Sequence, residues 1–435
     1  MNLFHQQIET NDTGEVILRK LLSLSKTVDR FGFLISGSDN FVLYIGGARY
    51  LNLNNTSEAF DVLESFHSDS SREIVGFLGY DLKNGLEKLE SNNYDPLEFP
   101  EAFFFESVAK FQFQDDQLIL ETDSKRRFEE LRNTFCKLDD ISEAENNCHP
   151  IPVTSREEYL HSAEAFKNHL QRGDIYEANY CIQFVDHNAD FDPYSGFLSL
   201  WNHTQAPFSA FAGFDNRFIL SGSPERYLKK SGQRLISQPI KGTSKRSVDH
   251  ILDEKSKNDL QNDPKEQSEN VMIVDLVRND LSRVADRDSV KVTELRGLHT
   301  FKTVHHLIST VEADLRTDKT AWDALKVTFP MGSMTGAPKI SAMKIIDQLE
   351  NFKRGPYSGA FGVINPKGDF DFNVLIRTLV FNREINTLGF GVGSAITVNA
   401  DPLKEYSECL LKADALIRSL CATQNEFKEV VSNKS

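Results

Sequence analysis

Capped helices alternate with strand-length apolar runs from about residue 150 onward, and this alternation most constrains the fold. Ser155 and Glu158 form a capping box before a helix that ends at Gly173. Two later helices begin with Asp-Pro pairs at residues 263–264 and 401–402, where proline occupies the first helical position. Helices interleaved with strands in this way predict one large α+β domain over residues 150–435.

The first 145 residues are predicted to form a separate amino-terminal region of mixed α/β structure. Apolar runs at residues 31–35 and 41–45 flank a turn-forming cluster, and runs at 103–113 and 117–121 resemble a second strand pair. Residues 139–153 are polar, acidic and interrupted by proline. We therefore expect a linker there, between a region at 1–145 and a domain at 150–435, which agrees with the length.

The overall charge and the cysteines exclude several classes of protein. The formal net charge is -15 at pH 7, so nucleic acid and anionic membranes would repel the chain, and an anionic substrate would need a local basic pocket. The five cysteines are odd in number and lack CxxC spacing, which indicates neither a disulfide framework nor a zinc site. No export signal opens the chain, and no apolar stretch reaches about 18 residues. We expect a cytoplasmic protein.

Residues 237–245, which read Ser-Gln-Pro-Ile-Lys-Gly-Thr-Ser-Lys, contain a candidate nucleophile. Pro239 biases the preceding residue toward an extended conformation, and Gly242 permits a tight turn just after Lys241. In a dry site the Lys241 ammonium would shift toward the neutral amine, which is a nucleophile. Spacing alone favours the commoner case, a solvated loop lysine.

Carboxylates on two predicted helices could bind a cation. Glu269 shares a helical stripe with apolar residues, so it needs a partner charge or a cation unless that face borders solvent. Glu408, close to Glu405 on the last helix, could simply form an exposed pair with Lys412. Alternatively, Glu269 and Glu408 would share one ion, and two carboxylates with water and substrate oxygens are typical of Mg²⁺.

Other groups could transfer a proton or bind an anion. Glu225 follows a turn, where it could act as a general acid or merely form a surface ion pair. Arg377 ends a strand and could clamp a carboxylate, whereas His306 fits a core histidine. Glycine-rich segments at 332–339 and 389–395 could present backbone amides to anions, although neither is a P-loop. Together these groups predict a magnesium enzyme acting on a small polycarboxylate.

A series of strings resembles the chorismate-utilising enzymes. They are Gly-Asp-Ile-Tyr (173–176), Ser-Pro-Glu-Arg (223–226), Pro-Ile-Lys-Gly-Thr (239–243), Glu-Asn-Val-Met-Ile-Val-Asp-Leu-Val-Arg-Asn-Asp (269–280), residues 332–339, Gly-Pro-Tyr-Ser-Gly-Ala (355–360) and Glu-Tyr-Ser-Glu (405–408). The resemblance runs in unbroken order over about residues 150–425, and the helix string is very specific. It implies an α+β fold with a large antiparallel β-sandwich core flanked by helices.

Within that family, the residue at position 241 distinguishes the reactions. Lysine there resembles the aminodeoxychorismate synthases, component I, whereas anthranilate synthases carry alanine. Isochorismate and salicylate synthases place a water-activating lysine where this chain has Glu177, which argues against water-adding chemistry. The resemblance implies conversion of chorismate and ammonia to 4-amino-4-deoxychorismate, toward 4-aminobenzoate and folate. The alternatives are an anthranilate synthase component I and a non-catalytic chorismate-binding subunit.

The resemblance also implies roles for individual residues. Lys241 attacks C2 of the ring, Glu225 protonates the departing C4 hydroxyl, and ammonia then enters at C4 and expels the lysine, with His306 near the reacting face. The implied ligands of Mg²⁺ are Glu269, Glu408 and, nearby, Glu405. The implied substrate-binding residues are Thr243, Ser333, Tyr357, Arg377, Gly393, Ala395 and Lys412.

Two further expectations concern partners and effectors. The chain lacks a Gly-x-Cys-x-Gly nucleophile elbow, so we expect ammonia from a separate glutamine amidotransferase subunit, or from free ammonium at high pH. Some members of the family bind tryptophan in an amino-terminal pocket. The positions that match that pocket here are Ser36, Pro207, Phe208 and Ser209.

Overall fold

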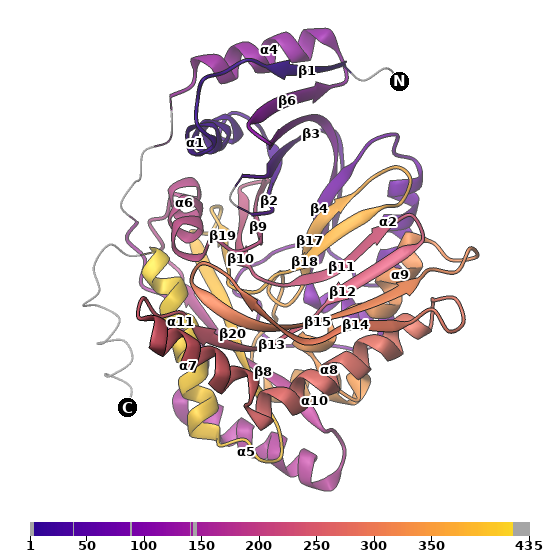
Figure 1. The fold of residues 1–435 in the computed structure, drawn as a ribbon, viewed down its shortest axis with the longest axis vertical. Helices are drawn as coiled ribbons and strands as arrows, with labels where there is room; N and C mark the ends of the chain where they lie inside the picture. The colour runs from indigo at the N-terminus through magenta and orange to yellow at the C-terminus, as the bar shows by residue number, and fades with distance from the viewer. Residues whose placement is uncertain (1–3, 38, 88, 140, 142–145, 421–435) are drawn as a thin grey trace.

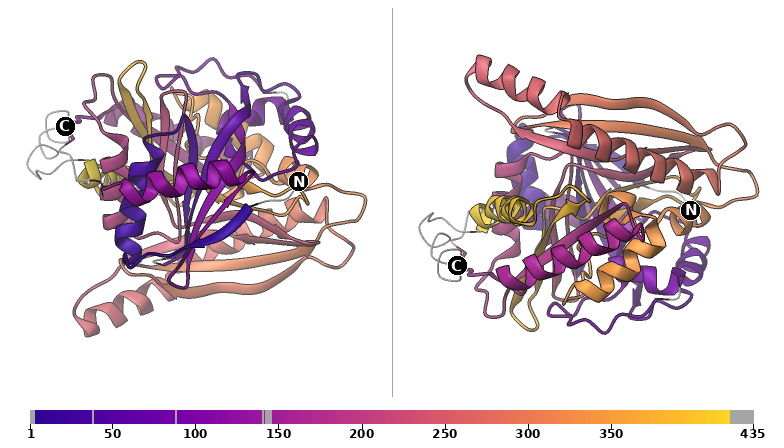
Figure 2. Two further views of the ribbon diagram at one scale, coloured as in Figure 1. Left: turned by 90° about the horizontal axis from the view of Figure 1, so that it is seen from above. Right: turned by 90° about the horizontal axis from the view of Figure 1, so that it is seen from below.

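The computed structural model describes residues 4–37, 39–87, 89–139, 141 and 146–420, and Figure 1 shows their arrangement. Strands form the centre of the molecule and helices lie around them (Figures 1 and 2). The predicted α+β class is confirmed. Every pairing between the named strands is antiparallel, for example β2 with β3 and β20 with β8.

One run of paired strands crosses most of the molecule. In spatial order it contains β1 (Phe4–Ile8), β6 (Gln117–Thr122), β5 (Ala102–Gln114), β3 (Phe41–Leu53), β2 (Arg30–Ile35), β9 (Phe208–Phe214), β10 (Arg217–Ser223), β19 (Thr378–Asn382), β20 (Thr387–Ile396) and β8 (Glu177–Asp186). The short strands β7 (Ile151–Pro152) and β16 (Gly336–Ala337) pair with β8.

A second run begins at the same β5. It contains β4 (Ile74–Leu78), β17 (Ala360–Ile364), β18 (Phe370–Val374), β11 (Arg226–Ser231), β12 (Arg234–Gln238) and β15 (Val304–Asp314). Two further strands, β13 (Ile240–Lys245) and β14 (Lys291–Thr300), also pair with β15. Because β10 belongs to the first run and β11 to the second, the chain passes between the two runs at residues 224–225.

Three buried apolar clusters fill the layers of this structure. The middle cluster is built from strands and loops of both runs, and its Phe103 and Phe214 rings stack with centroids 4.1 Å apart. The cluster on the first run includes helices α1 (Gly14–Ser25), α4 (Lys125–Lys137), α5 (Arg156–Arg172), α6 (Pro193–Thr204), α10 (Lys339–Leu349) and α11 (Pro402–Leu420). The cluster on the second run includes α2 (Ala59–Ser68), α8 (Pro264–Ser282) and α9 (Ala321–Thr328). The expected β-sandwich flanked by helices is confirmed.

The helices with the strongest sequence signals form where they were expected. The capping box of Ser155 and Glu158 starts α5, and Gly173 ends it with a φ of 80°. Asp263 caps α8, and Asp401 accepts a hydrogen bond from the Leu403 amide at the start of α11. These caps satisfy amides that have no partner within the helix.

The amino-terminal region shares its sheets with the rest of the chain. Strand β2 pairs with β9 along residues 30–35, and β4 pairs with β17 along residues 74–78. Residues 140 and 142–145 of the expected linker lie outside the described part. The boundary between 145 and 150 stays a prediction, but hydrogen bonds join the strands on its two sides.

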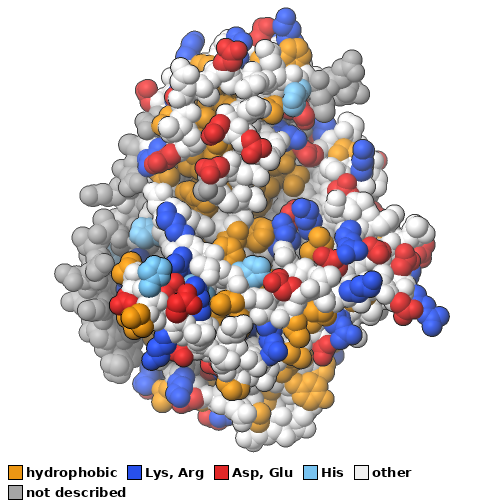
Figure 3. Space-filling model, in the orientation of Figure 1, with side chains coloured by type: hydrophobic (Ala, Val, Ile, Leu, Met, Phe, Trp, Pro, Cys, Tyr) orange, Lys and Arg blue, Asp and Glu red, His pale blue; other side chains and the backbone are white. Residues whose placement is uncertain are grey.

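Charged side chains of both signs lie on the surface. On the face in Figure 3, basic and acidic side chains are interspersed, without a continuous basic stripe. The described helices, which also include α3 (Lys83–Glu87) and α7 (His250–Gln261), include none that is long and apolar enough to cross a membrane.

Candidate active site

Lys241 lies on β13 and is held by two carboxylates. Its Nζ is 2.8 Å from Oε1 of Glu177 and 3.8 Å from Oε2 of Glu269, and only 12% of its side chain is exposed. Gly242 follows with a φ of 94°, a conformation that glycine adopts without strain. The structure therefore rules out the solvated loop lysine that spacing alone favoured.

The ionisation of Lys241 differs from the expectation for a dry site. Burial lowers the pKa of Lys241, but the negative charges of Glu177 and Glu269 outweigh burial and hold that pKa above its usual value. The predicted shift toward a neutral amine is therefore wrong for this state of the protein. Lys241 is an ammonium ion until a neighbouring carboxylate accepts its proton.

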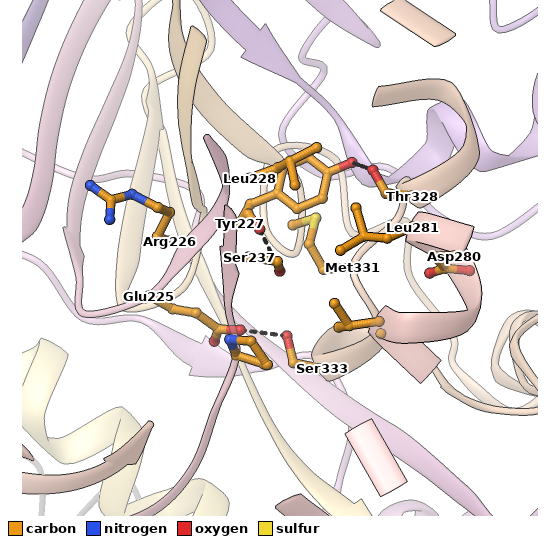
Figure 4. A pocket seen from close by; sticks show the side chains of 13 residues that line it. Glu225, Arg226, Tyr227, Leu228, Ser237, Asp280, Leu281, Thr328, Met331 and Ser333 are labelled. Atoms are coloured by element: carbon orange, nitrogen blue, oxygen red, sulfur yellow. Dashed lines mark hydrogen bonds between the residues drawn. The ribbon is translucent and has the colours of Figure 1, made fainter. Parts of the chain in front are cut away.

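Glu225 is a buried acid at the crossing between β10 and β11. The Ser333 hydroxyl donates a 2.7 Å hydrogen bond to its Oε1 (Figure 4). Burial raises the pKa of Glu225 to about 7, against the opposing effects of Ser333 and of the Lys241 charge. The surface ion pair considered for Glu225 is wrong, because Arg226 instead makes a two-pronged contact with Asp371 at 2.9 and 3.0 Å.

His306 and Arg377 bring a neutral ring and a cation to this region. His306 lies on β15, and its Nδ1 is 2.8 Å from the Thr243 hydroxyl. Burial, with the nearby Arg377 charge, lowers the pKa of His306 to about 3, so the ring is neutral. Arg377 follows the buried segment after β18, and its guanidinium has no hydrogen bond or ion pair to the described residues. An unpaired guanidinium beside a neutral ring is suited to bind a carboxylate.

A second group of charges joins α8 to α11. Lys265 Nζ lies 2.8 Å from Glu405 and 3.8 Å from Glu269, and both glutamates are buried. Burial raises the pKa of Glu269 to about 7, because the charged form is poorly solvated there. Glu408 is 42% exposed and pairs with Lys412 at 2.8 Å, the ordinary i,i+4 contact considered from sequence.

The carboxylates of this group suit a hard cation. Across the described residues, no three His, Cys, Asp or Glu side chains converge closely enough to hold a metal ion as they stand. Lys265 lies between two of the candidates. However, Oε1 of Glu269 and Oε2 of Glu405 are buried without a hydrogen-bond partner. Unsatisfied carboxylate oxygens are the donors that Mg²⁺ prefers, so this donor set fits the ion once the ammonium moves aside.

The remaining residues implied for substrate binding lie on β20 and beside it. Lys412 donates a 2.7 Å hydrogen bond to the Gly393 carbonyl, and Ala395 pairs opposite Asn179 of β8. Tyr357 is buried, and its ring is so close to Gly391 that a Cβ there would lie 2.3 Å from it. Close packing is therefore one reason for the glycines in this segment, and it is an alternative explanation to an anion-binding site.

The residues matched to a tryptophan pocket lie together at one end of β2 and β9. Ile35 pairs with Ser209, so Ser36, Pro207 and Phe208 are close neighbours. The Ser209 hydroxyl is fully buried and donates to the Ala206 carbonyl. Tryptophan binding at these residues stays a prediction.

Sequence reasoning missed Arg354, which connects several parts of the site. Its guanidinium is 1% exposed and makes a two-pronged ion pair with Glu350, at 2.6 and 2.9 Å. It also donates to the carbonyls of Met334, at 2.7 Å, and Asn179, at 2.8 Å. It thereby holds the turn that carries Ser333 against β8. The i,i+4 spacing of Glu350 and Arg354 was its only sequence signal.

We expect Arg354→Met to destabilise the protein strongly. The change leaves Glu350 charged, buried and without its partner, which typically costs about 3–5 kcal/mol. The double variant Arg354→Met/Glu350→Met should recover part of this loss, because neither charge of the pair remains, but two carbonyls and the Cys181 amide lose their partners. Urea unfolding of the three proteins measures both effects. A single variant as stable as the wild type would contradict this account of Arg354.

The assembled site combines a buried carboxyl, a buried lysine and buried carboxylate oxygens without hydrogen-bond partners. Glu225 is partly protonated near neutral pH, Lys241 is poised beside a proton acceptor, and Arg377 is free to bind an anion. Such a set can protonate a leaving hydroxyl while an amine attacks a polyanionic substrate.

Comparisons with known proteins identify the family of the chain. The family model described as chorismate binding enzyme matches residues 32–418. Anthranilate synthase component 1 of Synechocystis sp. is 38% identical over 62% of this chain and 54% of its own length. The chloroplastic aminodeoxychorismate synthase of Arabidopsis thaliana is 33% identical over 89% of this chain and 45% of its own length. The chain thus spans about half the length of these two relatives.

Aminodeoxychorismate synthase component 1 of Bacillus subtilis is 30% identical over 85% of this chain and 84% of its own length. Among solved structures, anthranilate synthase component I from Streptococcus pneumoniae superimposes with a TM-score of 0.77, at 24% identity, covering 87% of this chain and 92% of that chain. The relatives thus include both kinds of synthase, and the solved structure shares the fold. The chain belongs to the chorismate-binding enzyme family.

Proposed function

We propose that this chain is the chorismate-converting component of an aminodeoxychorismate synthase, which joins chorismate and ammonia to give 4-amino-4-deoxychorismate. The observation that carries this proposal is the buried Lys241, in contact with Glu177 and Glu269. An anthranilate synthase aminates C2 and eliminates pyruvate, which needs no lysine nucleophile. Relatives of both kinds are similarly close, so the choice rests on residue 241.

In the first half of the reaction, the Lys241 amine forms a bond to C2. Its excess proton passes to Glu177, the acceptor 2.8 Å from Nζ. The two ring double bonds shift, the C4–O bond breaks, and the departing hydroxide takes the proton of Glu225 and leaves as water. A carboxyl with a pKa of about 7 is well matched to this transfer at neutral pH.

In the second half, ammonia forms a bond to C4 and the double bonds shift back. The C2–N bond to Lys241 breaks, and the amine recovers its proton from Glu177. Glu225, now a carboxylate, accepts the surplus proton of the new amino group. Chorismate and ammonia thus give the 4-amino product and water, and the protein returns to its starting state.

Binding of the substrate is assigned to the surrounding groups. Chorismate carries two carboxylates, and the free Arg377 guanidinium suits the enolpyruvyl carboxylate. Tyr357, Gly393, Ala395, Lys412, Thr243 and Ser333 complete the proposed pocket. Glu269 and Glu408, with Glu405, would hold Mg²⁺, which when bound supplies positive charge to the ring carboxylate. Ammonia would come from a separate glutamine amidotransferase subunit, a proposal supported by the designation of the Bacillus relative as component 1.

Product analysis tests this function. The purified chain is incubated with chorismate, Mg²⁺ and ammonium, and the product is identified by mass spectrometry. We expect an aminated product that retains the enolpyruvyl group. Anthranilate with pyruvate would show the alternative synthase, and unchanged chorismate would favour a non-catalytic subunit.

We expect Lys265→Gln to strengthen Mg²⁺ binding. In the structure the Lys265 ammonium contacts Glu405 and Glu269, so the ion has to displace it. Removing this competing charge should tighten binding by about tenfold, roughly 1.4 kcal/mol. Calorimetric titration of Mg²⁺ into the chorismate-free protein measures the change, and Glu269→Gln should weaken binding in the same assay. Equal affinity in Lys265→Gln and wild type would contradict a site between these carboxylates.

A further inference from the structure

A small cavity lies beside Glu225. Its volume is about 20 Å³, and it is enclosed by β11, β12, η2 (Gly332–Met334) and the second half of α8. Figure 4 shows Glu225 and Ser333 together on one side, with Ser237, Met331 and Leu281 around the rest. Lys241, His306 and Arg377 do not line it.

The size and walls of the cavity suit a molecule with one heavy atom. A water-sized molecule needs about 10–15 Å³ of such space, so the cavity can hold one and little more. The Glu225 carboxyl and the Ser333 hydroxyl supply polar contacts. The opposite wall contains Val277, Asp280 and Leu281 of α8. The Asp280 carboxylate is already paired with Lys339, so a small neutral molecule suits this space better than a hydrated ion.

We propose that this cavity is the binding site for ammonia, positioned to deliver it to C4 of the substrate. The assignment rests on the proposed function, in which Glu225 protonates the hydroxyl that leaves C4. The acid that touches the leaving group at C4 also forms one wall of the cavity. A molecule in the cavity is therefore adjacent to the atom it has to reach, without passing Lys241.

The position of Glu225 beside the cavity also explains which group accepts the surplus proton of the new C4 nitrogen in the second half of the reaction. The nitrogen lone pair of ammonia forms the bond to C4, and the bond between C2 and Lys241 breaks with its electron pair on the lysine nitrogen. The new C4 nitrogen then carries one proton too many. Glu225, which gave its proton to the departing water, is beside the cavity and accepts it. One carboxyl thus serves both halves, and no other co-reactant is required.

Substitutions of Val277 that fill or enlarge the cavity test the proposed ammonia site. Val277→Leu adds one methylene at the wall, and Val277→Ala removes two methyl groups. Val274→Leu is the matched control, because Val274 lies on the same helix in the same core but does not line the cavity. All four proteins are assayed with chorismate, Mg²⁺ and either ammonium or methylammonium at pH 8.5, and thermal unfolding reports any loss of folding.

We expect Val277→Leu to raise the KM for ammonium by about tenfold, far more than the KM for chorismate, since one methylene in a small pocket has effects of this size. Val277→Ala should form a 4-methylamino product that the wild type does not. Ammonium KM values that are equal in Val277→Leu and Val274→Leu, with no methylamino product from Val277→Ala, would overturn the assignment. If the wild-type protein makes no 4-amino product, the proposed function is wrong, and the ammonia site that rests on it is wrong as well.

Discussion

Lys241→Ala is expected to abolish turnover of chorismate with ammonium. The covalent route depends on the Lys241 nitrogen bonding to C2, and no other lysine contacts Glu177 among the described residues. Loss of an essential nucleophile typically lowers kcat by at least about a thousandfold. Steady-state kinetics with mass identification of the product measures the loss, and intact-protein mass spectrometry without ammonium should show a substrate adduct only in the wild type.

The matched control is Lys245→Ala. Lys245 lies on the same strand β13 but is exposed, so its removal should leave kcat within about twofold, as for most surface changes. If Lys241→Ala retains the turnover of the Lys245→Ala protein, Lys241 is not the nucleophile, and an anthranilate-type reaction becomes the better description.

The second large effect is expected for Glu225→Gln. The amide keeps the hydrogen bond from Ser333 but has no acidic proton, so kcat should fall by about 10²- to 10⁴-fold. In the wild type, Glu225 has to be protonated, so kcat/KM should fall as the pH rises through the pKa of about 7. This decline should be absent from the residual activity of Glu225→Gln, and exposed Glu157→Gln should behave as wild type. An unchanged pH profile in Glu225→Gln would assign the proton to another group.

The same variant should be more stable than the wild type above neutral pH. Burial raises the pKa of Glu225 from 4.5 to about 7, so the folded state binds more protons than the unfolded state between these values. The stability contributed by the protonated carboxyl is fully present below pH 4.5 and is lost as the pH rises through 7. By pH 8.5 the difference should be on the order of 3 kcal/mol in favour of Gln. Thermal unfolding at pH 5 and 8.5 compares the two proteins, and Glu269, which titrates similarly, cancels in the difference.

Local signals allowed the helices to be predicted well, because a capping residue acts on amides only two or three positions away. Ser155 and Asp263 show this directly, and both accept hydrogen bonds from their own first turns. The resemblance implied one site for Lys241, Glu225 and Glu269, and the structure brings these three residues together, while their catalytic roles stay predictions. The resemblance indicated which residues lie together, but it did not indicate which charged groups surround them.

The ionisation of Lys241 could not be predicted from its own segment, because the deciding partner is far away in the chain. Glu177 lies 64 residues earlier, at the first position of β8. Arg354 presents the same difficulty, since its contact with the Asn179 carbonyl spans 175 residues. Lys265 reaches Glu405 across 140 residues, so its pairing with the carboxylates proposed to hold Mg²⁺ could not be predicted from either helix alone.

Strands β2 and β4 have a consequence for any shortened form of this protein. Each pairs with a strand from beyond residue 150, β2 with β9 and β4 with β17. A truncation that begins near residue 150 would leave one side of β9 and one side of β17 with bare backbone amides and carbonyls. Such open edges recruit strands from other molecules. The carboxy-terminal region expressed alone should therefore precipitate or swap strands between copies.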